Sequence, residues 1–271
     1  MGTGSKVYVI PLEVLPREAV VLKSGEVLVP AEPTTGRFRR AAVVSVLVAL
    51  IGTAALAVVG MLGVRWGMFS GSTQTSRLIA STSFVLAGVV GGISTRGSAY
   101  GCLVVAGLIF CWLGDMLGPW NFMYGVSAFL GAHGCFIGAF VTRGLSGKRA
   151  GAAAVFYVVA GAAVSVWLLP HVPARDLALV SAYIIVISVM AVMAWAADVK
   201  RGGWLIVAGA LLFYVSDIFV ARGRFVTSDA INAYVVYPFY YAACMMLALS
   251  ILTGPIGRVG PIKKAEQQQA D

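Results

Sequence analysis

Gly107-Leu108-Ile109-Phe110-Cys111-Trp112-Leu113-Gly114-Asp115 is an apolar run that ends in a carboxylate. A second run, Gly209-Ala210-Leu211-Leu212-Phe213-Tyr214-Val215-Ser216-Asp217, has the same frame. In both, a Gly precedes the Asp by eight residues and a small residue, Gly114 or Ser216, stands directly before it. A carboxylate near the centre of a membrane helix costs roughly 2.5–3.5 kcal/mol. Two of them in matching frames predict a duplicated unit and a shared polar site.

The composition is that of a membrane protein. Of the 271 residues, 59% are hydrophobic and 11% are charged, whereas a soluble domain has about 25% charged residues. The net charge of +9 would suit a nucleic-acid-binding protein. However, the basic residues flank the apolar runs, as the positive-inside rule predicts. We therefore expect membrane lipids as the surroundings and no nucleic-acid partner. The four cysteines lie in apolar runs and are interpreted as packing residues.

Eight apolar runs are long enough to cross a membrane, which takes about 20 helical residues. The predicted fold is all-α, with eight transmembrane helices in two parallel four-helix repeats. We expect a cytoplasmic N-terminal extension over 1–40, a transmembrane domain over 41–253 and a cytoplasmic tail over 254–271. Two short β-prone runs in Glu18–Pro30 favour a hairpin. The expected spans are 41–64, 75–94, 98–118, 121–142, 151–170, 176–197, 203–221 and 232–253.

The distribution of basic residues predicts the orientation. With eight spans, twelve Lys and Arg fall on one side and five on the other. This bias predicts that both termini are cytoplasmic and that the protein lies in the inner or plasma membrane. The twelve are Arg37, Arg39, Arg40, Arg96, Arg143, Lys148, Arg149, Lys200, Arg201, Arg258, Lys263 and Lys264, and the five are Arg65, Arg77, Arg175, Arg222 and Arg224.

Asp115 and Asp217 are the candidate catalytic residues. They belong to the third and seventh spans, which run in the same direction, so both lie near the outer ends of their helices. We expect them to face a shared cavity as a site for proton transfer or polar contact. The alternative is that water solvates them at the helix ends, with Arg222 or Arg224 as ion-pair partners.

Polar and aromatic residues gather in the outer halves of the fourth and eighth spans. An interfacial aromatic belt also explains them, but four tyrosines within eight residues exceed what anchoring requires. His133 in the fourth span is either an interhelical hydrogen-bonding group or a functional one. The candidate substrate-binding residues are Asn121, Tyr124, His133, Ser216, Arg224, Tyr237, Tyr240 and Tyr241.

Two histidines cannot build a three-His zinc site. A metal held by carboxylates and a histidine stays open, but we expect no metal and no other cofactor. The sequence also has no Gly-x-Ser-x-Gly elbow, P-loop or dinucleotide fingerprint. The spacings Gly114-x-x-x-Gly118 and Gly134-x-x-x-Gly138 are typical of close helix packing.

The motif Gly107-x-x-Phe110-x-x-x-Gly114-Asp115, followed by Phe122-x-x-Gly125-x-x-x-Phe129-x-x-x-His133, resembles the YhhN family of lysoplasmalogenase-type membrane proteins. The second Asp block, Arg224-Phe225 and Tyr240-Tyr241 agree with it. This chain departs from the family pattern in having Phe136 for a Tyr, Cys244 for a Gln and Arg77 for a Lys.

The resemblance implies hydrolysis of the vinyl-ether bond of lysoplasmalogens, lysophospholipids that yield a fatty aldehyde and a glycerophospho-head group. This chemistry needs a general acid, an anion that stabilises an oxocarbenium ion, and a water molecule. Two carboxylates can divide these tasks, as in glycoside hydrolysis; which of the two is the acid stays open. Arg222, Arg224 and the tyrosines are expected to hold the phosphate. The alternatives are a proton-coupled transporter, a lipid-binding membrane protein, or a homologue without activity.

Overall fold

The computed structural model describes residues 20–21, 27–28, 34–68, 70–95, 97–197 and 202–254. For residues 20–21, 27–28 and 34–39 it describes the backbone alone. The chain divides into two units, Met1–Val46 and Leu47–Asp271. In the first unit, β1 (Val20–Val21) pairs antiparallel with β2 (Val27–Leu28). The expected hairpin is therefore confirmed. The tail over 255–271 lies outside the described residues.

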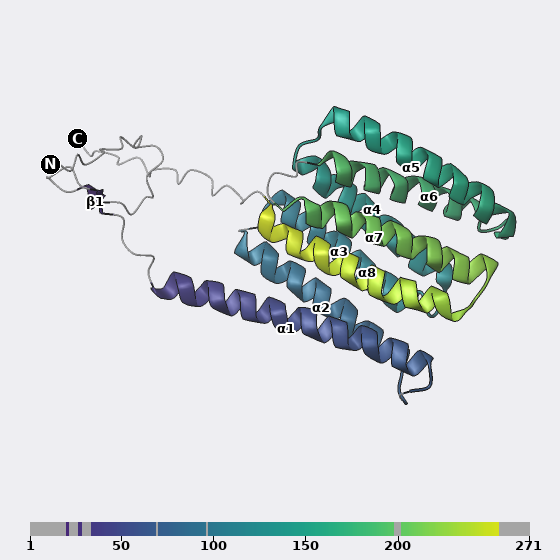
Figure 1. The fold of residues 1–271 in the computed structure, drawn as a ribbon, viewed down its shortest axis with the longest axis horizontal. Helices are drawn as coiled ribbons and strands as arrows, with labels where there is room; N and C mark the ends of the chain where they lie inside the picture. The colour runs from purple at the N-terminus through teal and green to yellow at the C-terminus, as the bar shows by residue number, and fades with distance from the viewer. Residues whose placement is uncertain are drawn as a thin grey trace, which may run out of the picture. The chain divides into compact units, whose positions relative to one another are not determined.

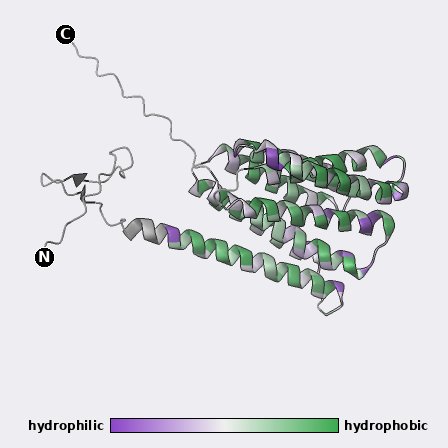
Figure 2. Ribbon diagram, turned by 45° about the horizontal axis from the view of Figure 1, so that its top comes forward, coloured by the Kyte–Doolittle hydropathy of each residue, from purple (hydrophilic) through white to green (hydrophobic). Residues whose placement is uncertain are grey.

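Eight described helices are long and apolar enough to cross a membrane, as the sequence predicts. They form a polytopic, all-α membrane protein. Figure 1 shows α2 to α8 running side by side along a common direction, and Figure 2 shows that hydrophobic residues dominate them. The helices are α1 (Thr34–Arg65), α2 (Thr73–Ser94), α3 (Ala99–Leu117), α4 (Phe122–Thr142), α5 (Gly147–Leu168), α6 (Leu177–Ala196), α7 (Trp204–Ala221) and α8 (Ala230–Ser250).

Local signals in the sequence set the ends of these helices. The side chains of Ser72, Ser98 and Asn121 accept hydrogen bonds from backbone N–H groups in the first turns of α2, α3 and α4. Gly97 and Gly144 adopt positive φ angles of 63° and 83° between consecutive helices, a conformation that glycine adopts without steric cost. A π-helical turn, Arg222–Val226, continues α7.

Small residues bring pairs of helices close together. A Cβ atom on Gly107 of α3 would lie 2.5 Å from the ring of Phe136 of α4, and one on Gly209 of α7 would lie 3.3 Å from a backbone carbonyl of α8. Gly118 and Gly125 also approach each other, because a Cβ on Gly125 would lie 2.9 Å from the Cα of Gly118. The packing interpretation was wrong for Gly134, which has open space around it.

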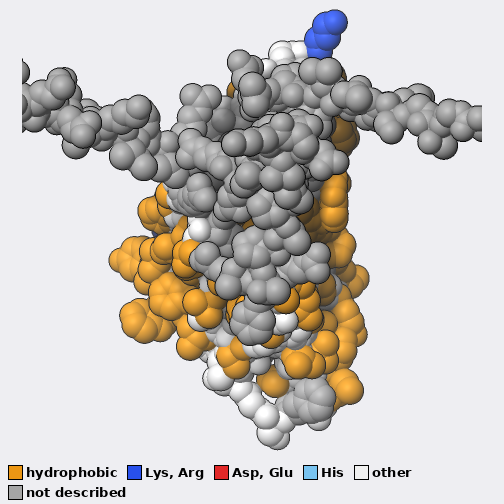
Figure 3. Space-filling model, turned by 90° about the vertical axis from the view of Figure 1, so that its left-hand side faces the viewer, with side chains coloured by type: hydrophobic (Ala, Val, Ile, Leu, Met, Phe, Trp, Pro, Cys, Tyr) orange, Lys and Arg blue, Asp and Glu red, His pale blue; other side chains and the backbone are white. Residues whose placement is uncertain are grey.

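The outward faces of the bundle are apolar. Leu56, Ile93, Val155 and Val166 expose 70% or more of their surface. Hydrophobic side chains also cover the flanks of the view in Figure 3, which looks along the bundle. Polar side chains in the middle of α2, in contrast, point inward: Ser81 is fully buried and Thr82 accepts a hydrogen bond from Trp112 of α3. The outward faces are suited to contact lipid chains, and polar side chains such as Ser81 lie in the interior of the bundle.

Candidate active site

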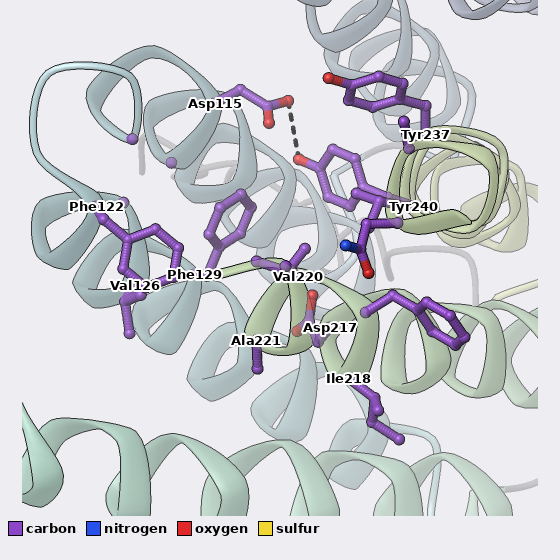
Figure 4. Close-up of a pocket in the computed structure, with 18 of the residues that line it drawn as sticks. Asp115, Phe122, Val126, Phe129, Asp217, Ile218, Val220, Ala221, Tyr237 and Tyr240 are labelled. Atoms are coloured by element: carbon purple, nitrogen blue, oxygen red, sulfur yellow. Dashed lines mark hydrogen bonds between the residues drawn. The ribbon is translucent and has the colours of Figure 1, made fainter. Parts of the chain in front are cut away.

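A single cavity of about 680 Å³ contains both aspartates in its lining. Residues near the junctions between α1 and α2, α3 and α4, α5 and α6, and α7 and α8 form its walls. The volume lies within the 300–1,000 Å³ typical of small-molecule sites. Figure 4 shows Asp115 and Asp217 contributed by different helices, with the hydroxyl of Tyr240 directed at Asp115. The two carboxylates therefore share one space, as the direction of their helices predicts.

Asp115 lies in a shell of hydroxyl groups and is 7% exposed. The hydroxyl of Ser81, on α2, donates to its Oδ2 atom. Tyr240 and Tyr241, on α8, donate to the same oxygen at 3.0 and 3.4 Å. The guanidinium of Arg77, on α2, interacts electrostatically with Asp115 and with Tyr237. Burial disfavours the ionised form of this carboxyl group, whereas the hydrogen-bond donors and the cation of Arg77 favour it.

Asp217 has a different set of partners. The hydroxyl of Tyr183, on α6, donates to Asp217 Oδ2 at 2.6 Å. His133 Nε2, on α4, lies 2.9 Å from the Tyr183 hydroxyl and 3.4 Å from Asp217 Oδ2. Because the Tyr183 proton goes to Asp217, His133 Nε2 is the donor to the tyrosine oxygen. His133 Nδ1 is buried and has no hydrogen-bond partner among the described residues.

The cavity is amphipathic, and the two aspartates lie toward different parts of it. Thr73, Gln74 and Arg77 of α2, together with Arg65 at the end of α1, form a polar and basic wall beside Asp115. The opposite wall is apolar and lies beside Tyr183 and Asp217. It consists of Val164 and Leu168 of α5, Val180, Ile184 and Ile187 of α6, and Ile218 of α7.

The structure brings some of the predicted site residues together at the cavity. Asp115, Asp217, Tyr237, Tyr240 and Tyr241 line it. His133 is fully buried behind the lining and reaches the cavity through Tyr183 and Asp217.

Other predicted residues have contacts elsewhere. Asn121 caps α4, and Ser216 is buried with its hydroxyl donating to the Phe213 carbonyl. Tyr124 is 61% exposed and is not part of the lining. Arg224 is exposed, with its guanidinium 5.0 Å from the ring centre of Phe122.

Arg222 pairs with Asp229 and not with Asp115 or Asp217. Its two terminal nitrogens lie 2.8 and 2.7 Å from the Asp229 carboxylate oxygens, and one also donates to Asn232 Oδ1 at 2.7 Å. This hydrogen bonding lowers the pKa of Asp229, which lies between the seventh and eighth spans. The alternative in which Arg222 neutralises Asp115 or Asp217 is therefore wrong, because its guanidinium is engaged at the end of the bundle.

Sequence reasoning missed Tyr183 and Ser81. Each of them lies 34 residues before the aspartate that its hydroxyl group contacts. A search for polar residues at matching distances from the two aspartates finds both.

No group of three or more His, Cys, Asp or Glu side chains within the described segments has the arrangement of a metal site. The cavity offers carboxylates, phenol and alcohol hydroxyls and two arginines. These groups can transfer protons and bind an anion, and the apolar wall of α5 and α6 can accommodate an apolar chain.

Comparison with known proteins gives a consistent assignment. Residues 73–251 match the YhhN family. Proteins named lysoplasmalogenase from Mycobacterium bovis and Mycobacterium tuberculosis are each 34% identical over 139 residues, which are 50% of this chain and 52% of theirs. A protein named lysoplasmalogenase from Bos taurus is 31% identical over 177 residues, 62% of this chain and 71% of its own.

The matched region thus spans about half the length of the mycobacterial relatives. No solved structure matches the chain. The family match covers α2 to α8, the helices that hold both aspartates and all their partners described above. The chain therefore belongs to the YhhN family.

Proposed function

We propose that this protein hydrolyses the vinyl-ether bond of lysoplasmalogens, releasing a fatty aldehyde and a glycerophospho-head group, with Asp115 and Asp217 as the catalytic pair. The observation that carries the proposal is that both carboxylates line one amphipathic cavity. The relatives named lysoplasmalogenase support the reaction class.

The walls of the cavity fit a single-chain phospholipid. Arg77 and Arg65 are suited to a phosphate, because guanidinium groups donate to phosphate oxygens in a fixed fork. The apolar wall of α5 and α6 is suited to the hydrocarbon chain. Arg77 and Arg65 replace Arg222 and Arg224 as the proposed head-group ligands, because Arg222 is paired with Asp229 and Arg224 is exposed outside the cavity lining.

The membrane placement belongs to the same proposal. The bias of Lys and Arg supports cytoplasmic termini and a location in the inner or plasma membrane. The cavity mouth then faces the outer leaflet. Tags at the two ends, tested with a membrane-impermeant reagent on intact cells, would both remain unlabelled.

The test is aldehyde release from a choline or ethanolamine lysoplasmalogen by purified protein in detergent. Asp115→Asn and Asp217→Asn are each expected to lower the rate at least 100-fold, because a positioned acid or base contributes about 10²–10⁴-fold. Asp176→Asn is the matched control, since Asp176 is buried like Asp115 but lies outside the cavity lining.

Each outcome has a clear meaning. A near-normal rate in either cavity variant would refute the catalytic pair. Loss of activity on adding a chelator would make the aspartates metal ligands. No aldehyde from folded wild-type protein would favour a transporter or a lipid-binding protein, which transport or ligand-binding assays would then examine.

A further inference from the structure

The shell of each aspartate, meaning the side chains that contact its carboxyl group, includes one residue at an equivalent sequence spacing. The chemical groups in the two shells differ. Ser81 and Tyr183 each lie 34 residues before the aspartate they contact, on α2 and α6. The remaining partners come from α8 for Asp115 and from α4 for Asp217. The shell of Asp115 holds three hydroxyl groups and the nearby cation of Arg77. The shell of Asp217 holds a tyrosine backed by a histidine.

We propose that Tyr183 and His133 are positioning residues that hold Asp217 as the proton donor, while Asp115 acts as the carboxylate base. This inference rests on the proposed function and deepens it. The polarity of the cavity leads to it, and the two sets of hydrogen-bond partners show which side chains position each carboxyl group.

The polarity of the cavity orders the substrate atoms. A phosphate on Arg65 and Arg77 and a chain along α5 and α6 place the ether oxygen toward Asp115. The second alkenyl carbon, which begins the hydrocarbon chain, then lies toward Asp217 and the apolar wall. In vinyl-ether hydrolysis this carbon receives the proton, so the aspartate on the chain side is the acid.

The steps balance with these roles. Asp217 gives its proton to the second alkenyl carbon as the C=C π electrons form the C–H bond and an ether-oxygen lone pair makes the oxocarbenium ion. Water adds to the first carbon and gives a proton to Asp115, which yields a hemiacetal. Asp115 then protonates the departing glycerol oxygen while the hemiacetal hydroxyl returns a proton to Asp217. Aldehyde and alcohol leave, and both carboxyl groups regain their starting states.

Tyr183 and His133 act through Asp217. When Asp217 loses its proton, the hydroxyl of Tyr183 donates to the new carboxylate, and His133 Nε2 donates to that hydroxyl oxygen. His133 is fully buried and its ring packs 4.9 Å from that of Phe213 between centres, which fixes this alignment. The other titratable groups near Asp217 are the buried thiols of Cys111 on α3 and Cys244 on α8, and Tyr214 of its own helix also lines the cavity.

The equivalent hydroxyl groups provide matched variants for a pH–rate experiment. Tyr183→Phe removes the hydrogen-bond donor to Asp217, and we expect the alkaline limb of the kcat profile to move up while the acidic limb stays in place. Ser81→Ala removes a donor to Asp115, so the acidic limb moves up instead. His133→Leu moves the alkaline limb in the same direction as Tyr183→Phe, and His133→Gln, which keeps a donor near the Nε2 position, moves it less.

Two results would overturn the inference. If Tyr183→Phe shifts the acidic limb of the pH–rate profile and Ser81→Ala shifts the alkaline limb, the roles of the two aspartates are reversed. If the variants lower the rate but shift neither limb, Tyr183 and His133 have a structural role only. Both results presuppose aldehyde release by the wild type, so they are distinct from a failure of the proposed function.

Formate rescue gives a second measurement if a shell variant does not fold. The rate of Asp217→Ala is expected to follow the concentration of undissociated formic acid, and that of Asp115→Ala the concentration of formate anion. Rescue of Asp217→Ala by the anion would refute its role as the proton donor.

Discussion

Adding one methyl group at Gly114 tests how tightly the site is packed. A Cβ atom there would lie 2.7 Å from two atoms of the Phe129 ring. Carbon atoms pack best at about 3.5–4.0 Å, so the ring must move by about 1 Å. Phe129 has little room to move, because its ring packs against Tyr240 and Phe213 with centre separations of 5.7 and 6.4 Å. We expect the displaced ring to push Tyr240 away from Asp115.

The size of the effect follows from two opposing terms. Replacing Gly by Ala in a helix stabilises it by about 1 kcal/mol, and overpacking costs about 1–3 kcal/mol. Gly134→Ala is the matched control, because Gly134 is also helical and a Cβ there meets nothing within 4 Å. The Gly114→Ala protein should therefore be about 1–3 kcal/mol less stable than the control, or about 2–4 °C in melting temperature for each kcal/mol.

The assay is thermal unfolding in detergent, with aldehyde release measured on the same preparations. Gly114→Ala should melt earlier than Gly134→Ala and lose most of its activity, while Gly134→Ala keeps both. Equal melting temperatures and equal activities for the two variants would refute the reasoning, since Phe129 would then be free to move without disturbing Tyr240.

Three further predictions concern the arginine in the cavity wall, the ion pair of Arg222 with Asp229, and the independence of the reaction from metal ions. Arg77→Gln should raise KM for lysoplasmalogen about tenfold or more by weakening phosphate binding, whereas Arg224→Gln, on an exposed residue, should leave KM unchanged; equal KM values would contradict the head-group assignment. Because Arg222 lowers the pKa of Asp229, their ion pair should stabilise the protein above the ordinary carboxyl range and lose this contribution as pH falls below about 4. Melting curves of wild type and Asp229→Asn should therefore converge in acid, and a constant difference would refute this. Chelators should leave aldehyde release unchanged, as measured after prolonged dialysis.

The sequence by itself determined the class of fold. Hydrophobic runs of about 20 residues have one stable solution in a bilayer, because a helix satisfies its own backbone hydrogen bonds. The eight expected spans therefore agree with the eight helices. It also singled out Asp115 and Asp217, because carboxyl groups are costly in apolar runs, and their matching frames placed both at one end of the bundle.

Only the tertiary structure decided the partners of those carboxyl groups. The contacts of Asp115 with Ser81 and Tyr240 join residues 34 and 125 positions apart. Such contacts depend on which helices are neighbours and on how each is rotated about its axis, and neither property is written in hydropathy. The rotation of α4 likewise leaves Tyr124 exposed while it buries His133.

The chemical character of the cavity walls was also a tertiary result. Arg77 and Arg222 both lie near the same end of the bundle, and the sequence does not distinguish their roles. The π-helical turn after α7 directs Arg222 to Asp229, whereas α2 places Arg77 in the cavity wall near Asp115. The sequence thus identified the reactive groups, but helix packing decided which charges and hydroxyl groups surround each, because electrostatic effects depend on distances across the bundle.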